Sequence, residues 1–366
     1  MAIHQVAPDT YEQQLDHKLE HLKQQFSALS LPEIDIYTSP VSHYRQRAEF
    51  KIWQEDGRAH YAMYEPGEYK KPYIISDFHV GSERINELMP ALLEAINSND
   101  LLRKRLFQVE FLTTKSGEAL ITLIYHRPLD EEWLSVAQQL KAQLHADIIG
   151  RSRKQKLLLD RDFVIEKLQV DGAELTYKQV EGSFTQPNAH VCEKMLSWAN
   201  KHTCNAAGDL LELYCGNGNF TVPLSRHFNK VLATEISKTS VEAAKYNFDH
   251  NAVHNVEIAR MSSEEFTQAM DQVRPFRRLS HIDLGSYQFS SIFVDPPRAG
   301  LDNETLTLSQ RFENIIYVSC NPDTLFENLT KLTTTHHIEH FAVFDQFPYT
   351  HHLECGVILR RHSLGS

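Results

Sequence analysis

Residues 210–220 read LLELYCGNGNF, and this stretch is the strongest indication of the fold of the second half of the chain. Its apolar run from Leu210 to Tyr214 predicts a buried strand, and Gly216 and Gly218 place a tight turn between that strand and a helix. Glycine lets the backbone approach a ligand closely, and a helix N-terminus offers unpaired N–H groups. The glycines are fewer than in the full dinucleotide fingerprint, so two interpretations stay open: a ligand site or a helix-packing turn.

An alternation of strand and helix continues after this stretch. Helical stretches separate further apolar strand runs, which lie at 230–234, 256–261, 291–294 and 315–318. Such alternation predicts an α/β fold, a Rossmann-like parallel sheet covered by helices on both faces. Two last runs, near 339–344 and 355–359, are joined by a link too short for a helical crossover, so we expect the last strand to run antiparallel.

The first half of the chain has a different pattern. Apolar residues at three- and four-residue spacing predict an amphipathic helix over 9–29. Two pairs of strand-like runs, within 45–64 and 107–125, each flank a glycine turn, and helical segments follow both pairs. We therefore predict an α+β domain with an antiparallel sheet, followed by the Rossmann-like domain, with boundaries at 1–181 and 182–366.

Basic residues in the first domain gather near aromatic ones. Arg45 and Arg47 precede Phe50, and a second basic group, at 103–105, precedes Phe107. Cations beside stacking rings are typical of surfaces that bind single-stranded RNA, although each group could equally be a solvated face. The formal net charge of −11 argues against a partner as acidic as RNA, but local clusters matter more than the total. We expect RNA to bind at Arg45, Arg47 and Phe107.

The expected ligand of the glycine turn is a nucleoside. Glu235 ends the next strand about 20 residues on, where a carboxylate can bind both ribose hydroxyls. The missing third glycine and the absence of a phosphate-binding G-K-[ST] motif argue against a phosphorylated ligand and for S-adenosylmethionine. Ser262 and Ser263 stand where many such enzymes place an aspartate for the adenine amino group, so adenine recognition stays unassigned.

Three polar motifs follow the later strands and therefore gather at one edge of the sheet. They are Asp295-Pro296-Pro297-Arg298, Cys320-Asn321-Pro322 and the link that ends at Glu354. Asn321 is a suitable N-cap and Pro322 a suitable first helical residue, so the Cys320 sulfur is expected to face a helix N-terminus. That setting favours the thiolate. The alternative is a buried structural cysteine.

Composition sets further limits. No stretch approaches the roughly 18 apolar residues that a membrane span needs, so we expect a cytoplasmic protein without a membrane partner. The five cysteines are odd in number and lack C-x-x-C spacing, which argues against disulfides. The twenty histidines show no spacing typical of a structural zinc site, so we expect no metal. We expect a monomer.

Longer motifs resemble one family. DPPRAG at 295–300 with IIYVSCNPDT at 315–324, and FDQFPYTHHLE at 344–354, resemble the two signatures of the RNA uracil-C5 methyltransferases. The FTQPN segment at 184–188 and the glycine turn are similar to that family as well. SPVSHYRQRAEF at 39–50 resembles its tRNA (uracil-5-)-methyltransferase branch, which makes 5-methyluridine at position 54, in the T-loop of tRNA. The resemblance spans nearly the whole chain.

The resemblance implies a class I S-adenosylmethionine-dependent methyltransferase domain preceded by a tRNA-binding domain. It implies that Cys320 is the nucleophile and Glu354 the proton acceptor. The cofactor contacts that it implies are Gln186, Tyr214, Asn219, Glu235 and Asp295, beside the glycines at 216 and 218. A thiolate that adds at uracil C6 makes C5 nucleophilic, and a base then removes the C5 proton so that the sulfur can leave. Transfer-messenger RNA is a second candidate substrate.

Three other functions are alternatives to tRNA uracil-C5 methylation. The ribosomal-RNA branch of the family binds an iron-sulfur cluster through four cysteines, and Cys192, Cys204 and Cys215 lie too far apart for that spacing, so we expect no cluster. Amino-group methyltransferases usually have an aromatic residue after Asp-Pro-Pro, where this chain has Arg298. An RNA-folding factor for the tRNA elbow would need no chemistry, and both roles could coexist in one protein.

Overall fold

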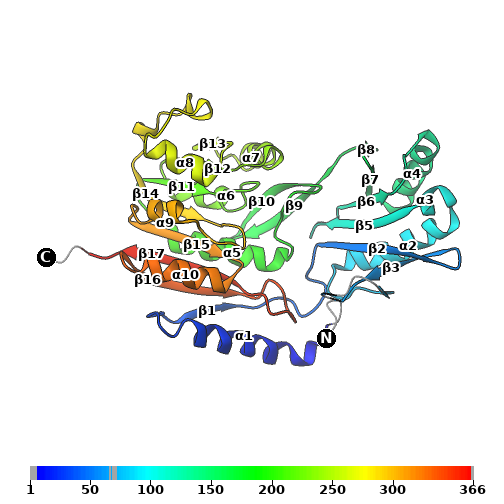
Figure 1. Cartoon of the computed structure of the whole chain (residues 1–366), viewed down its shortest axis with the longest axis horizontal. Coiled ribbons are helices and arrows are strands. Elements are labelled where there is room, and N and C mark those ends of the chain that lie inside the picture. The colour runs from blue at the N-terminus through cyan, green and yellow to red at the C-terminus, as the bar shows by residue number, and fades with distance from the viewer. Residues whose placement is uncertain (1–5, 66, 68–71, 364–366) are drawn as a thin grey trace. The chain divides into compact units, whose positions relative to one another are not determined.

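The computed structural model describes residues 6–65, 67 and 72–363. The chain divides into two compact units. The first comprises Met1–Pro8, Pro40–Lys167 and Gln179–Ala189, and the second comprises Asp9–Ser39, Leu168–Lys178 and His190–Ser366. Figure 1 labels the helices and strands of both units.

An eight-stranded sheet forms the centre of the second unit. The strand order is β1-β16-β17-β15-β14-β11-β12-β13. β17 runs antiparallel to both of its neighbours, and all other neighbours in the sheet are parallel. The Rossmann-like sheet with an antiparallel last strand is therefore confirmed. Its strands are β1 (Ile34–Tyr37), β11 (Asp209–Leu213), β12 (Val231–Thr234), β13 (Val256–Ala259), β14 (Phe289–Val294), β15 (Asn314–Ser319), β16 (His336–Phe344) and β17 (Glu354–Arg361).

Helices cover both faces of this sheet (Figure 1). One buried core combines apolar residues of the sheet with side chains of α1, α8, α9 and α10, among them Phe266, Leu308 and Leu329. Towards the other face, Trp198 of α5 packs edge-on against Phe344 of β16, with ring centroids 5.8 Å apart. The helices are α1 (Tyr11–Gln25), α5 (Ala189–Thr203), α6 (Thr221–Leu224), α7 (Lys238–His250), α8 (Ser263–Met270), α9 (Asn303–Ser309) and α10 (Pro322–Leu332).

The N-terminal helix α1 belongs to the second unit, which differs from the expected domains 1–181 and 182–366. Its buried stripe, Tyr11, Leu15, Leu19 and Leu22, joins the core of the eight-stranded sheet, and β1 pairs with β16. Phe26 contacts the rings of Phe326 and Phe341 edge-on, at 5.4 and 5.6 Å. An amphipathic pattern tells which face of a helix is buried but not which sheet covers it.

The first unit contains a seven-stranded sheet with the order β4-β3-β2-β5-β6-β7-β8. All neighbours are antiparallel except β6 and β7, which run parallel. The expected antiparallel sheet does not extend to this pair, because the helix α4 (Glu131–Leu144) forms a crossover between the two strands. The strands are β2 (Arg47–Glu55), β3 (Arg58–Met63), β4 (Tyr73–Ile74), β5 (Leu106–Thr113), β6 (Ala119–Tyr125), β7 (Asp147–Ser152) and β8 (Gln155–Leu158).

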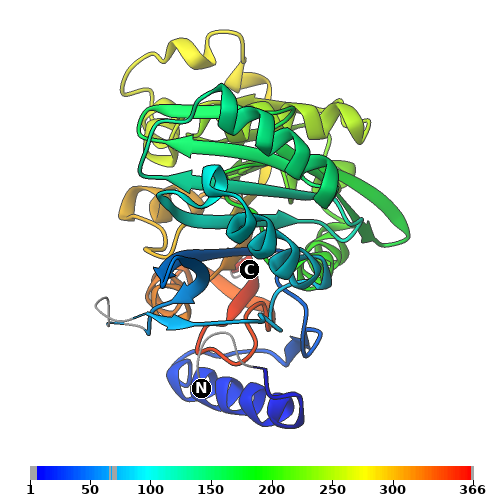
Figure 2. The same cartoon turned by 90° about the vertical axis from the view of Figure 1, so that its right-hand side faces the viewer.

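Three helices lie on one face of this sheet (Figures 1 and 2). They are α2 (Glu83–Ser98), α3 (Asp100–Arg103) and α4 (Glu131–Leu144). Asp130 is the N-cap of α4, and its side chain accepts a hydrogen bond from the N–H of Trp133. The buried Trp133 ring packs edge-on against Tyr125 of β6. The α+β character of the first unit is therefore confirmed.

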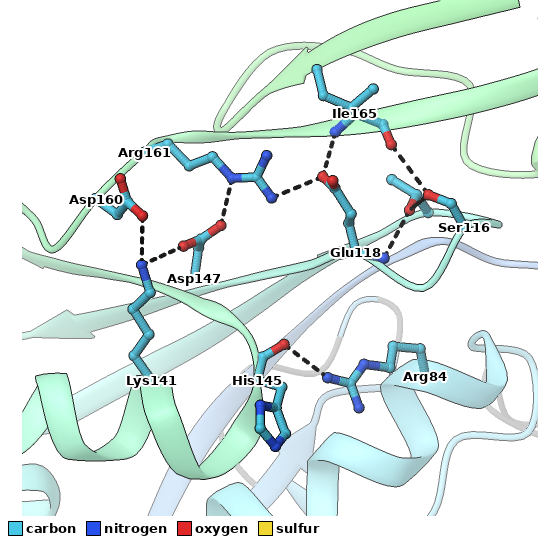
Figure 3. Close-up of polar contacts among 10 residues, drawn as sticks. Arg84, Ser116, Glu118, Lys141, His145, Asp147, Asp160, Arg161 and Ile165 are labelled. Atoms are coloured by element: carbon cyan, nitrogen blue, oxygen red, sulfur yellow. Dashed lines mark hydrogen bonds and ion pairs between the residues drawn. The ribbon is translucent and has the colours of Figure 1, made fainter.

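A network of charged side chains fixes the segment that follows β8, the last strand of this sheet (Figure 3). Arg161 donates to Asp147 at 2.6 Å and to Glu118 at 2.9 Å, and Lys141 bridges Asp147 and Asp160 at 2.9 and 2.8 Å. Glu118 also accepts from the N–H of Ile165 at 2.7 Å. The network ties the start of β9 (Phe163–Val170) to β6, β7 and α4. β9 and β10 (Ala173–Val180) form a hairpin, and the border between the two units crosses it.

Candidate active site

The register of two antiparallel strands brings Cys320 and Glu354 together. The ladder between β15 and β17 ends with the pair Ser319 and Cys355. Because antiparallel partners advance in opposite directions, the next position on each strand is Cys320 on one side and Glu354 on the other. Glu354 is also paired with Phe344 of β16 and is only 3% exposed. A thiol and a buried carboxyl therefore meet at the end of the central strands.

Cys320 stands directly before α10, as the sequence predicts. Asn321 is the N-cap of this helix, its side chain accepts from the N–H of Asp323 at 3.1 Å, and Pro322 opens the helix. Nevertheless, burial and the charges of Glu354 and Asp295 raise the pKa of the Cys320 thiol to about 11, although Arg298 opposes the rise. The expectation that this setting favours the thiolate is wrong, because burial and two carboxylates outweigh the helix end.

Three carboxyl groups of the second unit have raised pKa values, and two of them, Glu354 and Asp295, act on the thiol. Burial raises the pKa of Glu354 to about 8 and that of Asp295, which follows β14, to about 7. Asp295 contributes to the rise at Glu354, and it does the same at Glu212 of β11, whose pKa burial raises to about 8. Like charges in one dry site disfavour joint ionisation. The site can therefore hold protons near neutral pH, close to the thiol.

The geometry of the glycine turn after β11 is compatible with both of the uses that the sequence left open. Tyr214, Gly216 and Gly218 all have positive φ, at 61°, 57° and 79°. A Cβ on Gly218 would lie 2.6 Å from the ring of Phe248 in α7, so this glycine is required for packing. A Cβ on Gly216 would meet no described atom within 4 Å, so that side of the turn is open to a ligand.

Glu235 lies against this turn, as the sequence predicts. Its carboxylate accepts from the N–H of Gly216 at 3.0 Å and from the N–H of Ser237 at 2.7 Å. Tyr214 exchanges a hydrogen bond of 2.7 Å with Ser263, which accounts for one of the two serines after β13. The main-chain oxygen of Asn219 accepts from the Tyr177 hydroxyl at 2.8 Å. Glu235 thus contacts the turn at Gly216, and Tyr214, Gly218 and Asn219 lie in the same turn.

Gln186 belongs to the first unit, whereas the other expected cofactor residues belong to the second. Its segment is extended and half-buried, and the next residue, Pro187, accepts a hydrogen bond from the N–H of Gln46 at 2.7 Å. The contact of Gln186 with a cofactor stays a prediction.

The expected RNA-binding residues differ in their surroundings within the first unit. Arg45 is half-buried and its Nε donates to the main-chain oxygen of Arg47 at 2.8 Å, while Arg47 donates to the oxygen of Ser183 at 2.6 Å. The Phe107 ring is 37% exposed, stacks on His126 with centroids 4.2 Å apart, and has the Lys51 ammonium 4.4 Å from its centroid. Phe107 therefore presents a partly open aromatic surface beside a cation.

Within residues 6–65, 67 and 72–363, no group of three or more His, Cys, Asp and Glu side chains could hold a metal ion. In the same residues, no helix combines the length and apolar character of a membrane span. The five cysteines are all unpaired with one another.

The comparisons with known proteins agree on one family. The model of the tRNA (uracil-5-)-methyltransferase family matches residues 10–362. A tRNA/tmRNA (uracil-C(5))-methyltransferase of Cellvibrio japonicus is 63% identical over 351 residues, with 96% of each chain covered. The protein of the same name from Saccharophagus degradans is 61% identical, with 98% of each chain covered. The chain belongs to the tRNA (uracil-5-)-methyltransferase family.

A solved structure shows the same fold. The tRNA (uracil-54, C5)-methyltransferase of Pyrococcus abyssi, in complex with S-adenosyl-L-homocysteine, superposes with a TM-score of 0.73. It is 20% identical, and the match covers 95% of this chain and 83% of that one. The resemblance to the family that the motifs indicate is confirmed, and with it the Rossmann-like methyltransferase fold.

Two further residues with unusual surroundings in the structure were not indicated by any sequence motif. Glu212 is 1% exposed, and neither of its carboxylate oxygens has a hydrogen-bond partner among the described residues. The sequence feature that marks Glu212 is its position as a single acidic residue within an apolar strand. Ile236 follows Glu235 and is 67% exposed, which is a large apolar surface at the end of β12. Its signal was weak, because single exposed apolar residues are common.

The buried acid at 212 should make stability depend on pH. A carboxyl whose pKa in the folded chain is about 8, against an ordinary 4.5, stabilises the fold fully below pH 4.5 and loses that contribution as pH rises to about 8. Glu212→Gln should flatten the fall in the free energy of unfolding across this window by up to about 1.4 kcal/mol per pH unit. Urea unfolding at a series of pH values measures the slope. Glu257→Gln, at an exposed position of β13, is the control, and an identical slope in wild type and Glu212→Gln would contradict the expectation.

Proposed function

We propose that this chain methylates C5 of the uridine at position 54, in the T-loop of tRNA, with S-adenosylmethionine as methyl donor. The observation that supports this proposal most is the register that sets Cys320 opposite Glu354 at the end of the β15 and β17 ladder. The relatives named tRNA/tmRNA (uracil-C(5))-methyltransferases support the same substrate class and add transfer-messenger RNA as a second candidate. The protein acts in the cytoplasm as a single copy.

The chemistry needs a nucleophile and a base at adjacent positions. The Cys320 thiol first gives up its proton to solvent, the sulfur then bonds to C6 of the uracil, and the electron pair of the C5–C6 double bond becomes available at C5. S-adenosylmethionine would supply the methyl group that C5 takes up, with S-adenosyl-L-homocysteine as the leaving group. Glu354 then removes the proton of C5, the double bond forms again, and the sulfur leaves. Because a T-loop base is sheltered in folded tRNA, the uridine must first turn out of its stack.

The pKa values fit this order of events. A protonated Glu354 carries no charge, so it does not oppose ionisation of the neighbouring Cys320 thiol. Glu354 must be ionised later, when it accepts the C5 proton. The raised pKa of its carboxyl also makes it a stronger base than an ordinary glutamate.

The residues around the glycine turn are suited to hold the cofactor. Glu235 can bind the ribose hydroxyls, the open side of Gly216 allows close approach, and Ile236 offers an apolar surface for the adenine ring. Tyr214, Gly218, Asn219 and Asp295 complete the site in this proposal, and the contact of Gln186 with the cofactor stays a prediction. Burial raises the pKa of Asp295 to about 7, so this carboxyl is partly ionised near neutral pH, which suits a ligand that carries a positive sulfonium.

Loss of the Glu235 carboxylate should weaken cofactor binding. Glu235→Ala removes charge-assisted hydrogen bonds worth about 1.5–3 kcal/mol each, which corresponds to roughly a 10- to 150-fold rise in Kd for S-adenosyl-L-homocysteine. Isothermal titration calorimetry measures this Kd. Glu242→Gln, at an exposed position of α7, serves as the matched control. An unchanged Kd for Glu235→Ala would remove Glu235 from the ribose site.

RNA binding should depend on the Phe107 surface. In this proposal Arg45, Arg47 and Phe107 contact the RNA, and Phe107 stacks on an unpaired base. Phe107→Ala should weaken tRNA binding by about 1–3 kcal/mol without altering its salt dependence, while Lys51→Met should reduce the salt slope by about one. Fluorescence anisotropy at several salt concentrations separates the two effects. Leu158→Ala, at an exposed position of β8, is the control. Wild-type affinity for Phe107→Ala would contradict the assignment.

A labelled-methyl assay tests the proposed function as a whole. Purified chain is mixed with tRNA transcribed without modifications and with the same tRNA in which the T-loop uridine is replaced by cytidine. Label should enter only the first RNA, and nuclease digestion should recover it as 5-methyluridine. Label in both tRNAs, or in neither, would contradict the proposal. Transfer-messenger RNA in a parallel reaction decides whether it is a second substrate.

A further inference from the structure

The N-terminal helix α1 contacts the connection between β16 and β17, which comprises residues 345–353 and ends directly before Glu354. Tyr11, Gln14 and Lys18 reach it from one face of α1, because their spacing of three and four residues matches the helical turn. None of these residues was singled out for function by its sequence motif. Phe344 and Glu354 pair across the two strands, so the connection is a closed loop between them.

A buried ion pair anchors the start of the connection. Lys18 donates to Oδ1 of Asp345 at 2.7 Å, and Gln14 donates to Oδ2 of the same carboxylate at 2.9 Å. The side chains of Lys18 and Asp345 are 7% and 0% exposed. Burial lowers the pKa of Lys18, and the charge of Asp345 opposes this change. Burying two charges is costly, so a hydrophobic contact would serve stability alone at least as well.

The same two residues of α1 also hold the backbone of the connection. Lys18 donates to the main-chain oxygen of Phe347 at 2.9 Å, and Gln14 accepts from the N–H of Tyr349 at 3.1 Å. Tyr349 has a φ of 63°, which is strained for a residue with a side chain. Its ring packs edge-on against Tyr11, with centroids 6.1 Å apart. Strained backbone persists where its surroundings fix it, and here α1 supplies two contacts to Tyr349 and one to Phe347.

We propose that Gln14 and Lys18 are positioning residues for Glu354, which hold the β16–β17 connection in the shape that keeps the Glu354 carboxylate buried beside Cys320. Both residues act through the connection and touch no reacting atom. This inference rests on the proposed function in one respect, the role of Glu354 as the base. The hold of α1 on the connection is independent of that role and can be measured separately.

Two variants of the full chain test the proposal. Lys18→Met removes the charge from the buried pair, and Gln14→Ala removes two hydrogen bonds without leaving an unpaired charge, so it remains informative if Lys18→Met folds poorly. Lys23→Met, at an exposed position of the same helix, is the matched control. Hydrogen-deuterium exchange of the peptide spanning 345–353 reports on the connection. Steady-state methylation of unmodified tRNA gives kcat and KM.

In both variants, the amide hydrogens of residues 345–353 should exchange faster than in wild type, and those of residues 209–220 should not. The affinity for S-adenosyl-L-homocysteine should stay at the wild-type value. A small displacement of a catalytic group can cost about 10²-fold in rate, so kcat should fall by up to about this factor while KM for tRNA stays unchanged. Wild-type exchange in 345–353, or an unchanged kcat, would overturn the proposal. Glu354→Gln is assayed beside them: if it turns over normally, the proposed base is wrong, and the exchange data still decide whether α1 holds the connection.

Discussion

Cys320→Ala should abolish both methyl transfer and the covalent bond between protein and RNA. Without the sulfur, no group adds at C6, and C5 of uracil is too weak a nucleophile to take a methyl group from a sulfonium. Loss of a covalent nucleophile lowers turnover by about 10⁴-fold or more in other enzymes. The measurement is a denaturing gel of enzyme, S-adenosylmethionine and tRNA, together with a labelled-methyl assay.

Two comparisons make this result specific to Cys320. Cys204→Ala removes an exposed cysteine and should behave as wild type in both assays. Binding of S-adenosyl-L-homocysteine by Cys320→Ala should be normal, because the glycine turn and Glu235 follow β11 and β12, whereas Cys320 follows β15. A slow-migrating band formed by Cys320→Ala would show that another residue bonds to the RNA.

Glu354→Gln should stall the reaction after methyl transfer and accumulate the covalent complex. The amide keeps the size and hydrogen-bonding reach of the carboxyl but cannot accept the C5 proton, so the sulfur cannot leave. Loss of a positioned base lowers turnover by about 10²–10⁴-fold. Glutamine also resembles the protonated carboxyl, the form that the raised pKa of about 8 favours at neutral pH, so the fold should tolerate the change.

The gel distinguishes this stalled complex from simple inactivity. Glu354→Gln should give a slow-migrating band that contains the labelled methyl group, and wild-type enzyme on tRNA with 5-fluorouridine at the target should give the same band, since fluorine cannot leave as a proton. Glu327→Gln, at an exposed position of α10, is the control and should turn over normally. Normal turnover by Glu354→Gln would show that another group removes the proton.

Local patterns predicted much of the second unit. The run at 210–214 lies within one residue of β11, and the expected helix start at Asn321 and Pro322 is the start of α10. The neighbourhood of Glu235 and the glycine turn was predictable as well, because consecutive parallel strands place their carboxyl ends at one edge of a sheet. In the first unit, the direction of β7 was not predictable, since it depends on the route that the chain takes through α4.

The order of strands and helices, the glycine turn and the chemical groups at the sheet edge could be predicted from the amino-acid sequence, because these depend on residue type and on neighbours close in the chain. The folded structure was needed to establish that α1 packs on the eight-stranded sheet, that Lys18 meets Asp345, and that Cys320 stands opposite Glu354. It also decided the pKa values, since those of Cys320 and Glu354 rise through burial and through charges brought together from distant parts of the chain. Burial and long-range proximity are properties of the packed chain, and no short stretch of sequence contains them.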